Sequence, residues 1–459
     1  MMLAVVGAGI SGLAAAFEVT RQGIPVQVFE SSERIGGLIH TEQCGGYTID
    51  AGADSMLWAK PSAAALCEEL GLAASLQTMQ PPRTAYVLER GRLFPLPSPS
   101  VLGLPLSLRA AARFALLPPR ARARVALERY LRGRARGPLA ADESVADLFR
   151  RRFGAATVRA IAQPLLGGIH AGDVERLSVG ALFPSLVEAE RRHGSVTRGL
   201  ARRPASRDGL FRSLAGGMAV LPGAIRSALP AGAIRTGDEV GAIVPDGGRW
   251  RVEAARGTIT ADAVLCAAPL PACARLIAPF DPEAAWLLAG IQHASTVSVA
   301  LAWPRSAVAH PLEGSGFVVA RGDDRFRVTA CSWVSSKWEG RAPAGRVLLR
   351  AFLGGTHDEG AIDLDDDRLA GIAARDLATV LGIRAAPELV RIYRWRRASP
   401  QLVVGHNARV AQIEQHLARH AGLFLACRGF RSVGIPDCIA EGRRAAAAAA
   451  DYSRRTVRA

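Results

Sequence analysis

Three glycines and one acid near the N-terminus have the spacing needed to bind a phosphorylated ligand. Gly7, Gly9 and Gly12 form a G-x-G-x-x-G pattern, and Glu30 follows 18 residues after Gly12. In this pattern the first glycine permits a tight turn, the second lets a pyrophosphate approach the backbone, and the third lets a helix pack against the preceding strand. The carboxylate of Glu30 suits a ribose hydroxyl. These residues predict a dinucleotide-binding site.

The site requires a strand, a helix and a second strand in that order. Residues 3–6 are apolar and predict a buried parallel strand, residues 12–22 predict a helix, and residues 24–30 predict a second strand that ends at the acid. The helix directs its N-terminal amides at the phosphates, where its dipole favours negative charge. Ile10 and Ser11 lie inside the motif and join the predicted site.

Two further glycine-rich segments, residues 31–37 and 46–55, indicate a ligand longer than a nicotinamide dinucleotide. A nicotinamide enzyme usually continues with another helix and strand, whereas here glycines follow at once. Arg34 is placed to meet a phosphate, and the glycine pair after it can pass close to a cofactor; a surface turn that merely needs glycine is the alternative. We add to the predicted cofactor site Ser31, Arg34, Gly36, Gly37, Gly52, Ala53 and Asp54.

The bulk composition is that of a folded globular protein of two or three domains. The chain has 459 residues, of which 49% are hydrophobic and 21% charged, and a net charge of +16. Almost all of the positive charge is arginine, since Lys60 and Lys337 are the only lysines. A basic balance is compatible with nucleic acid, anionic lipid or an acidic substrate. No basic run is interleaved with aromatic residues, so we expect no nucleic-acid partner.

The cysteines and the apolar segments restrict the cellular setting. The seven cysteines form no C-x-x-C pair, so we expect mostly buried thiols in a reducing compartment and no metal site. The apolar N-terminus lacks the positive region of a signal peptide. No apolar stretch of 18 or more residues predicts a membrane-spanning helix. The expected protein is cytoplasmic, either soluble or peripheral to a membrane.

Three further segments resemble the flavin-dependent porphyrinogen oxidases of haem biosynthesis (protoporphyrinogen and coproporphyrinogen III oxidases), within the amine-oxidase-like flavoprotein superfamily. The first is Pro164–Ser178, the second is Ser399–Gln401 with Val404–His406 after it, and the third is Gly429–Ile439. Together with the N-terminal motif they extend the resemblance over residues 1–450 in the order of that family.

The resemblance implies an α/β protein, α+β in its inserted part. Its FAD-binding domain is Rossmann-like and assembled from discontinuous segments, residues 1–60, 205–270 and 400–459. A substrate-binding domain with a mixed sheet takes residues 61–96 and 271–399, and a helical, membrane-facing insertion takes residues 97–204.

The resemblance also implies the chemistry. Such enzymes remove six electrons and six protons from a porphyrinogen, passing hydrides to flavin N5 and electrons to oxygen, while the protein supplies position and electrostatics. Gly429 and Gly434 bring backbone near the flavin ring. The helix that Ile435 opens aims its positive end at the flavin pyrimidine. Val240 lies against the adenine.

The macrocyclic substrate has an apolar body and carboxylate-bearing propionates, and three residues are candidates to bind it. Gly168 is expected to present its backbone carbonyl to a pyrrole. His170 stands where the family commonly has an aromatic residue; it is either a packed histidine or, as a weak candidate, a general base, and we assign no other catalytic residue. Lys60 either faces a propionate or is solvated.

Two departures and one basic stretch qualify the resemblance. Ala53 replaces a usual proline and Leu38 a usual basic residue, so no phosphate contact is expected from position 38. Residues 104–136 mix apolar residues with many arginines, which favours either an anionic membrane surface or a solvated face. These arginines are Arg109, Arg113, Arg120, Arg122, Arg124, Arg129, Arg132, Arg134 and Arg136, against one acid, Glu128.

Several alternatives remain open at this point. The expected partners are a porphyrinogen, molecular oxygen, an anionic surface on the inner face of the cell membrane and a downstream chelatase that receives the product. The substrate is either coproporphyrinogen III, with four propionates, or protoporphyrinogen IX, with two. Another amine-oxidase-like enzyme, acting on an amine or a carotenoid, is the second hypothesis, and a flavin-binding scaffold or porphyrin chaperone without turnover is the third.

Overall fold

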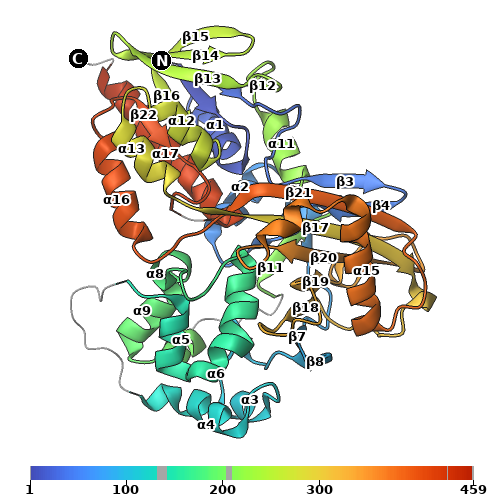
Figure 1. Cartoon of the computed structure of the whole chain (residues 1–459). Helices are drawn as coiled ribbons and strands as arrows, with labels where there is room; N and C mark the ends of the chain where they lie inside the picture. Colours follow the sequence, from blue (N-terminus) through green and yellow to red (C-terminus); the bar gives the residue numbers. More distant parts are fainter. Residues whose placement is uncertain (1, 132–141, 203–208, 432, 457–459) are drawn as a thin grey trace.

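A computed structural model describes the chain except residues 1, 132–141, 203–208, 432 and 457–459. Arg132, Arg134, Arg136 and Ser432 therefore lie outside the described residues. Figure 1 shows three parts: a parallel sheet with helices on both faces, a larger mixed sheet beside it, and a group of helices at the opposite end from the N-terminus.

The five-stranded parallel sheet draws its strands from the beginning, middle and end of the chain. This confirms the predicted discontinuous nucleotide-binding unit, and the first two strands and the helix between them form as the sequence predicts. In spatial order the strands are β12 (Ile234–Arg235), β2 (Val26–Phe29), β1 (Leu3–Val6), β16 (Ala263–Cys266) and β22 (Leu423–Leu425).

Alternate residues of these strands enter two separate cores, as the two-residue period of a strand requires. Leu3 and Val5 face the core built with four helices, and Ala4 and Val6 face the core on the other side. The first core contains α1 (Ile10–Arg21), α2 (Pro61–Glu69), α11 (Val220–Ala228) and α17 (Ile435–Thr456). The second contains α12 (Leu270–Ile277), α13 (Pro282–Ala289), α16 (His406–Leu417) and the sheet of β13 (Val240–Asp246), β14 (Arg249–Ala254) and β15 (Gly257–Ala261).

The second large sheet is mixed, as predicted for the substrate-binding part: β18 and β7 run parallel and all other neighbours antiparallel. Helix α15 (Asp366–Leu381) packs against it. In spatial order its strands are β21 (Leu389–Pro400), β17 (His293–Pro304), β20 (Arg346–Gly354), β19 (Ala330–Ser332), β18 (Gly316–Val319), β7 (Ala85–Glu89) and β8 (Arg92–Pro95).

Small elements join the two sheets. A hairpin of β3 (Thr41–Cys44) and β4 (Tyr47–Asp50) leads into the second glycine-rich segment. β11 (Phe211–Leu214) pairs with β5 (Met56–Leu57) and β6 (Leu76–Thr78), and the short helix α14 (Val334–Lys337) precedes β20.

Residues 108–131 and 142–201 form a helical insertion with its own core. No helix of the described chain is both long and apolar enough to cross a membrane. After the short strands β9 (Ser100–Val101) and β10 (Leu104–Pro105) come α3 (Leu108–Arg113), α4 (Pro119–Leu127), η2 (Glu128–Tyr130), α5 (Val145–Phe153), α6 (Ala155–Thr157), η3 (Val158–Gly167), α7 (Gly168–His170), α8 (Val179–Leu182), α9 (Pro184–His193) and α10 (Val196–Ala201).

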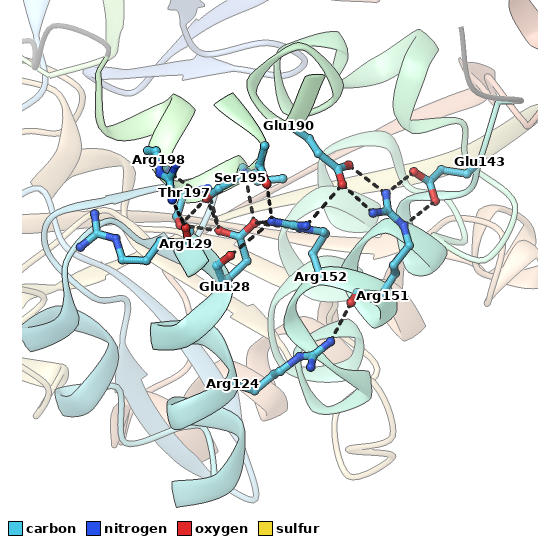
Figure 2. A network of polar contacts seen from close by, with 12 residues as sticks. Arg124, Glu128, Arg129, Glu143, Arg151, Arg152, Glu190, Ser195, Thr197 and Arg198 are labelled. Atoms are coloured by element: carbon cyan, nitrogen blue, oxygen red, sulfur yellow. Dashed lines mark hydrogen bonds and ion pairs between the residues drawn. The ribbon is translucent and has the colours of Figure 1, made fainter. Parts of the chain in front are cut away.

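Glu128, the one acid of the arginine-rich stretch, is fully buried at the centre of this insertion (Figure 2). Its carboxylate accepts hydrogen bonds from Arg152 Nε at 2.8 Å and from the backbone amides of Val196 and Thr197 at 2.9 and 3.1 Å. It therefore binds the N-terminus of α10, where a helix favours negative charge. Burial would raise the pKa of Glu128, but Thr197 and Arg152 outweigh that and lower it.

Candidate functional site

The glycine turn after β1 has the geometry that its motif requires. Gly7 has a φ of +105°, and a Cβ on Gly12 would lie 2.0 Å from the Gly7 carbonyl oxygen, so neither position accepts a side chain. A Cβ on Gly9 would meet no atom within 4 Å. Ile10 and Ser11 open helix α1 directly behind this turn. The turn is thus closed at its first and third glycines and open at the second, where a phosphate would approach.

Glu30 lies beside the same turn, at the end of β2. Its Oε2 accepts from the Ala8 amide at 2.9 Å, and its Oε1 accepts from the Ser32 amide at 3.0 Å, with the Ser31 hydroxyl at 3.4 Å. These bonds fix the carboxylate next to the glycines. Because each carboxylate oxygen can accept more than one hydrogen bond, Glu30 keeps capacity for a ribose hydroxyl.

The segment after Glu30 folds back onto the first glycine turn. Gly36 donates its amide to the Ala8 carbonyl at 2.8 Å and pairs with Gly9 in an isolated bridge. Arg34 donates from Nη1 to the Gly37 carbonyl at 2.7 Å. Its described contact is therefore with backbone, and burial lowers its pKa although Glu30 opposes the shift.

Residues 50–55, called here the loop 50–55, are held by side chains of the mixed sheet. Ser298 of β17 donates to the Ala51 carbonyl at 2.8 Å, and Arg350 of β20 donates to the Gly52 carbonyl at 2.7 Å and also to the Asp50 carbonyl. Trp395 of β21 adds a bond to Ala51 at 3.2 Å. A Cβ on Gly52 would lie 2.0 Å from the Leu38 carbonyl oxygen, so the loop also packs closely on the glycine-rich segment before it.

The carboxylate of Asp54, at the end of this loop, is buried among cations. Lys337 Nζ lies 2.9 Å and Arg350 Nη2 3.6 Å from its Oδ2, and its carbonyl accepts from the Ser213 hydroxyl at 2.8 Å. Burial would raise the pKa of Asp54, but Lys337 and Arg350 outweigh it and hold the pKa well below its usual range. Ala53 lies between these anchored residues and is half-buried.

Val240, predicted to lie against an adenine, opens β13 close to the end of β2. It is buried in the same core as Phe29, and two residues earlier the Asp238 amide donates to the Glu30 carbonyl at 2.9 Å. The structure thus places Val240 near Glu30, the residue predicted to bind the ribose.

The C-terminal segment forms a turn between β22 and α17. Gly429 has a φ of +88°, and a Cβ there would lie 2.4 Å from Pro400, so this turn packs directly on the end of β21. Gly434 precedes Ile435, the first residue of α17.

Lys60 contacts this segment. Its Nζ lies 2.5 Å from Asp437 Oδ1 in the first turn of α17, and the neighbouring Ser62 hydroxyl donates to the Pro436 carbonyl at 2.5 Å. Lys60, expected either to face a propionate or to be solvated, is therefore paired within the chain, next to the start of α17.

The segments that carry the family resemblance meet in space. Gln401 donates from Nε2 to the His170 carbonyl at 3.0 Å, and the His406 ring lies 2.8 Å from the Phe430 carbonyl. Gln163 donates to the Gly172 carbonyl at 2.9 Å. Residues 164–178, 399–406 and 429–439 are thus one connected unit, although more than 200 residues separate the first segment from the other two.

Gly168 and His170 lie in this unit, at the end of the π-helical segment η3. A Cβ on Gly168 would meet no atom within 4 Å, and its carbonyl accepts from the Ala171 amide at 3.2 Å. His170 is buried and its ring meets Phe183 edge-on, with ring centroids 5.4 Å apart. Burial and the nearby Arg428 lower the pKa of His170 to about 4, so its imidazole is neutral at pH 7.

Sequence reasoning missed the side chains that hold these backbones in place. Arg350, Ser298 and Trp395 come from strands with no motif, so only the fold brings them to the loop 50–55. Lys337 carried a signal, since it is one of two lysines in the chain. A cavity of about 470 Å³ lies elsewhere, at the β7–β8 turn, and its arginines are largely paired with acids such as Asp323, so it is not the predicted site.

The fold and the site define a flavoprotein oxidoreductase, and the chain belongs to the flavin-containing amine oxidoreductase family, whose sequence pattern matches residues 10–450. It is 34% identical to the coproporphyrinogen III oxidase of Bacillus subtilis (strain 168), over 98% of this chain and 97% of that protein. It is 27% identical to protoporphyrinogen oxidase 2 of Arabidopsis thaliana, over 97% and 92% of the two chains.

A crystal structure of a protein from Exiguobacterium sp. 255-15 is also similar. It superposes with a TM-score of 0.86 at 31% identity, covering 97% of this chain and 98% of that one. The predicted family is confirmed. The residues also fit the phosphate groups of the flavin cofactor that the family contains. A Cβ on Gly9 would meet no atom, so a phosphate can approach there, whereas Gly7 and Gly12 leave no room for a side chain.

Proposed function

We propose that the protein is an FAD-dependent porphyrinogen oxidase that converts coproporphyrinogen III to coproporphyrin III, with oxygen as acceptor. The observation that carries the proposal is the meeting of the macrocycle and flavin segments through Gln401 and His406, bonded to the carbonyls of His170 and Phe430. The full-length relatives named coproporphyrinogen III oxidases support the choice of substrate.

The residues take the following roles in this proposal. Gly7, Gly9 and Gly12 hold the pyrophosphate, Glu30 the ribose, Val240 the adenine, and the loop 50–55 with Gly429, Gly434 and Ile435 the ring. When bound, FAD supplies the hydride acceptor. Gly168 contacts a pyrrole by its backbone, and His170 shapes the apolar wall as a neutral ring. Residues 1–60, 205–270 and 400–459 form the FAD-binding domain, and residues 61–96 and 271–399 the substrate-binding domain.

The helical insertion is the proposed membrane-facing surface. Leu108 is 49% exposed on α3, which also carries the exposed Arg109 and Arg113, and Leu127 and Tyr130 are 54% and 67% exposed on α4 and η2. Apolar side chains next to arginines suit an anionic lipid surface. From there the product passes to a chelatase.

Aerobic turnover of purified protein tests the proposed function. Coproporphyrinogen III and protoporphyrinogen IX are supplied side by side, and porphyrin fluorescence is followed against autoxidation. We expect kcat/KM to be higher for coproporphyrinogen III. No turnover of either substrate by flavin-loaded protein would contradict the proposal and direct the search to amine and carotenoid substrates.

A further inference from the structure

Arg428, located where the flavin and macrocycle segments meet, forms no ion pair with a carboxylate among the described residues. It donates from Nε to the Val433 carbonyl at 3.1 Å and from Nη1 to the Ala398 carbonyl. Within the part of the chain that the structure describes, no acid forms an ion pair with it, and Nη2 makes no hydrogen bond. Most other arginines near this site, such as Arg350, have an acid within 4 Å.

The surroundings of Arg428 disfavour its charged form. Burial lowers its pKa, and the only group that opposes the shift is the thiol of Cys438. Burial lowers the pKa of His170 and of His293, and the charge of Arg428 contributes to both shifts, together with Arg397 at His293. A half-buried cation that contacts only backbone carbonyls among the described residues is unfavourable unless an anion joins it. The site therefore favours a negatively charged ligand.

The groups around the guanidinium identify which ligand reaches it. Ala398, which accepts from Nη1, lies two residues before the end of β21. The charge of Arg428 also acts on His293 at the start of β17 and on His170 in the macrocycle segment, so the charged end lies among elements of the substrate side. The flavin pyrimidine already has the N-terminus of α17 as its proposed positive partner. The anion that fits this position is a carboxylate on the substrate, which an arginine binds in a planar, two-pronged geometry.

We infer that Arg428 binds a propionate carboxylate of the macrocycle and thereby favours porphyrinogens that carry more propionates. This inference rests on the proposed function. It makes Arg428 a specificity-determining residue that no motif in the sequence indicated, since it lies one position before the recognised segment that begins at Gly429.

The test compares Arg428→Met and Arg428→Lys with the exposed control Arg419→Met. For each protein, kcat and KM are measured with coproporphyrinogen III and protoporphyrinogen IX. The dissociation constants of the two product porphyrins are measured by fluorescence without turnover, so that charge discrimination is measured even if the wild type oxidises neither substrate. Flavin absorbance and midpoint potential are recorded on the same preparations.

The expected result is a KM for coproporphyrinogen III and a Kd for coproporphyrin III raised ~10-fold or more in Arg428→Met, the size of a lost charge-assisted hydrogen bond. The two-propionate compounds change less, the flavin potential is unchanged, and Arg428→Lys retains part of the discrimination. Equal losses for both compounds would overturn the inference. So would a shifted flavin potential with unchanged discrimination, which would assign Arg428 to the flavin. If Arg428→Met does not fold, Arg428→Lys decides by the same ratio.

Discussion

At the scale of single residues, the site is built from side chains whose charge is fixed by burial. His170 is neutral because burial and Arg428 disfavour its protonated form. Asp54 stays ionised because Lys337 and Arg350 outweigh its burial. A porphyrinogen has an apolar ring and charged rim groups, so a neutral imidazole next to an uncompensated guanidinium suits it better than a histidine that titrates near pH 7.

His170→Phe tests the neutral role of this side chain. We expect kcat/KM to change less than about threefold and its profile between pH 6 and 8 to keep its shape, because a pKa of about 4 lies outside that range. The unfolded chain binds more protons than the folded one between pH 6.5 and about 4, so wild-type stability falls there as pH falls, and the variant loses this dependence. A loss of activity above 100-fold with flavin retained would instead indicate a proton-transferring His170.

At the scale of elements, a buried carboxylate joins four separate segments of the helical insertion. The carboxylate of Glu128 in η2 accepts hydrogen bonds from Arg152 of α5 and from the first amides of α10. It also accepts one from the hydroxyl of Ser195, the residue that caps α10. Arg151 and Arg152 also reach Glu190 of α9 (Figure 2). The acid in the arginine-rich stretch is therefore structural, and among the described residues the basic surface predicted there includes the exposed arginines of α3 and α4.

Glu128→Gln removes the buried charge nearest to Arg152 and leaves that cation with the more distant carboxylate of Glu190, at 3.5 Å. We expect a loss of about 3 to 5 kcal/mol in the free energy of unfolding, measured by urea denaturation. The lowered pKa of Glu128 means that its contribution is present above its ordinary value of 4.5 and is lost as pH falls through the folded pKa. The control is the exposed Glu188→Gln in α9, for which little change is expected; an equal effect in both variants would contradict the argument.

At the scale of the whole molecule, the mixed sheet holds the loop that the nucleotide-binding part presents to its cofactor. Side chains from outside that part bind the loop 50–55, those of Ser298, Lys337, Arg350 and Trp395, and Arg350 alone binds two of its carbonyls. Substrate-side and cofactor-side units are thereby fixed relative to each other through backbone acceptors. Because both sheets are attached to the same loop, we expect them to position a flavin and a substrate relative to each other more accurately than two unconnected lobes would.

Arg350→Met breaks this connection without removing a residue of the proposed flavin contacts. We expect flavin affinity to fall by at least 10-fold, the equivalent of losing hydrogen bonds from a charged donor worth about 1.5 to 3 kcal/mol. Flavin content after dialysis and the visible absorbance spectrum measure it. Arg346→Met at the start of the same strand, whose exposed partner is Glu388, is the matched control. Unchanged flavin affinity in Arg350→Met would show that the loop is held without it.

The sequence predicted those parts of the molecule that depend on local chemistry. The glycine spacing, the acid at position 30 and the alternation of strands and helices can each be recognised from residues close together in the sequence. The parallel and mixed sheets agree with the predictions made from these local patterns. The partners of Lys60 and Asp54 were not predictable, because Asp437 and Lys337 lie hundreds of residues away and meet them only in the folded chain. The roles of Arg350 and Arg428 likewise arise from burial, which a charge pattern along the chain does not show.

The order of strands in the parallel sheet also determines when that sheet can be completed during synthesis. Leu423, the first residue of β22, lies 394 residues beyond Phe29 at the end of β2, and β22 is an edge strand that pairs only with β16. At ribosomal speeds of 5 to 20 residues per second, roughly 20 to 80 s pass between the two strands. Once β16 has been synthesised, the nascent chain has an open, apolar sheet edge at that strand until β22 follows, 157 residues after Cys266, and α17 does not yet cover α1. A chain assembled in this way depends on protection of that edge, by its own other domains or by a chaperone, until β22 and α17 have left the ribosome.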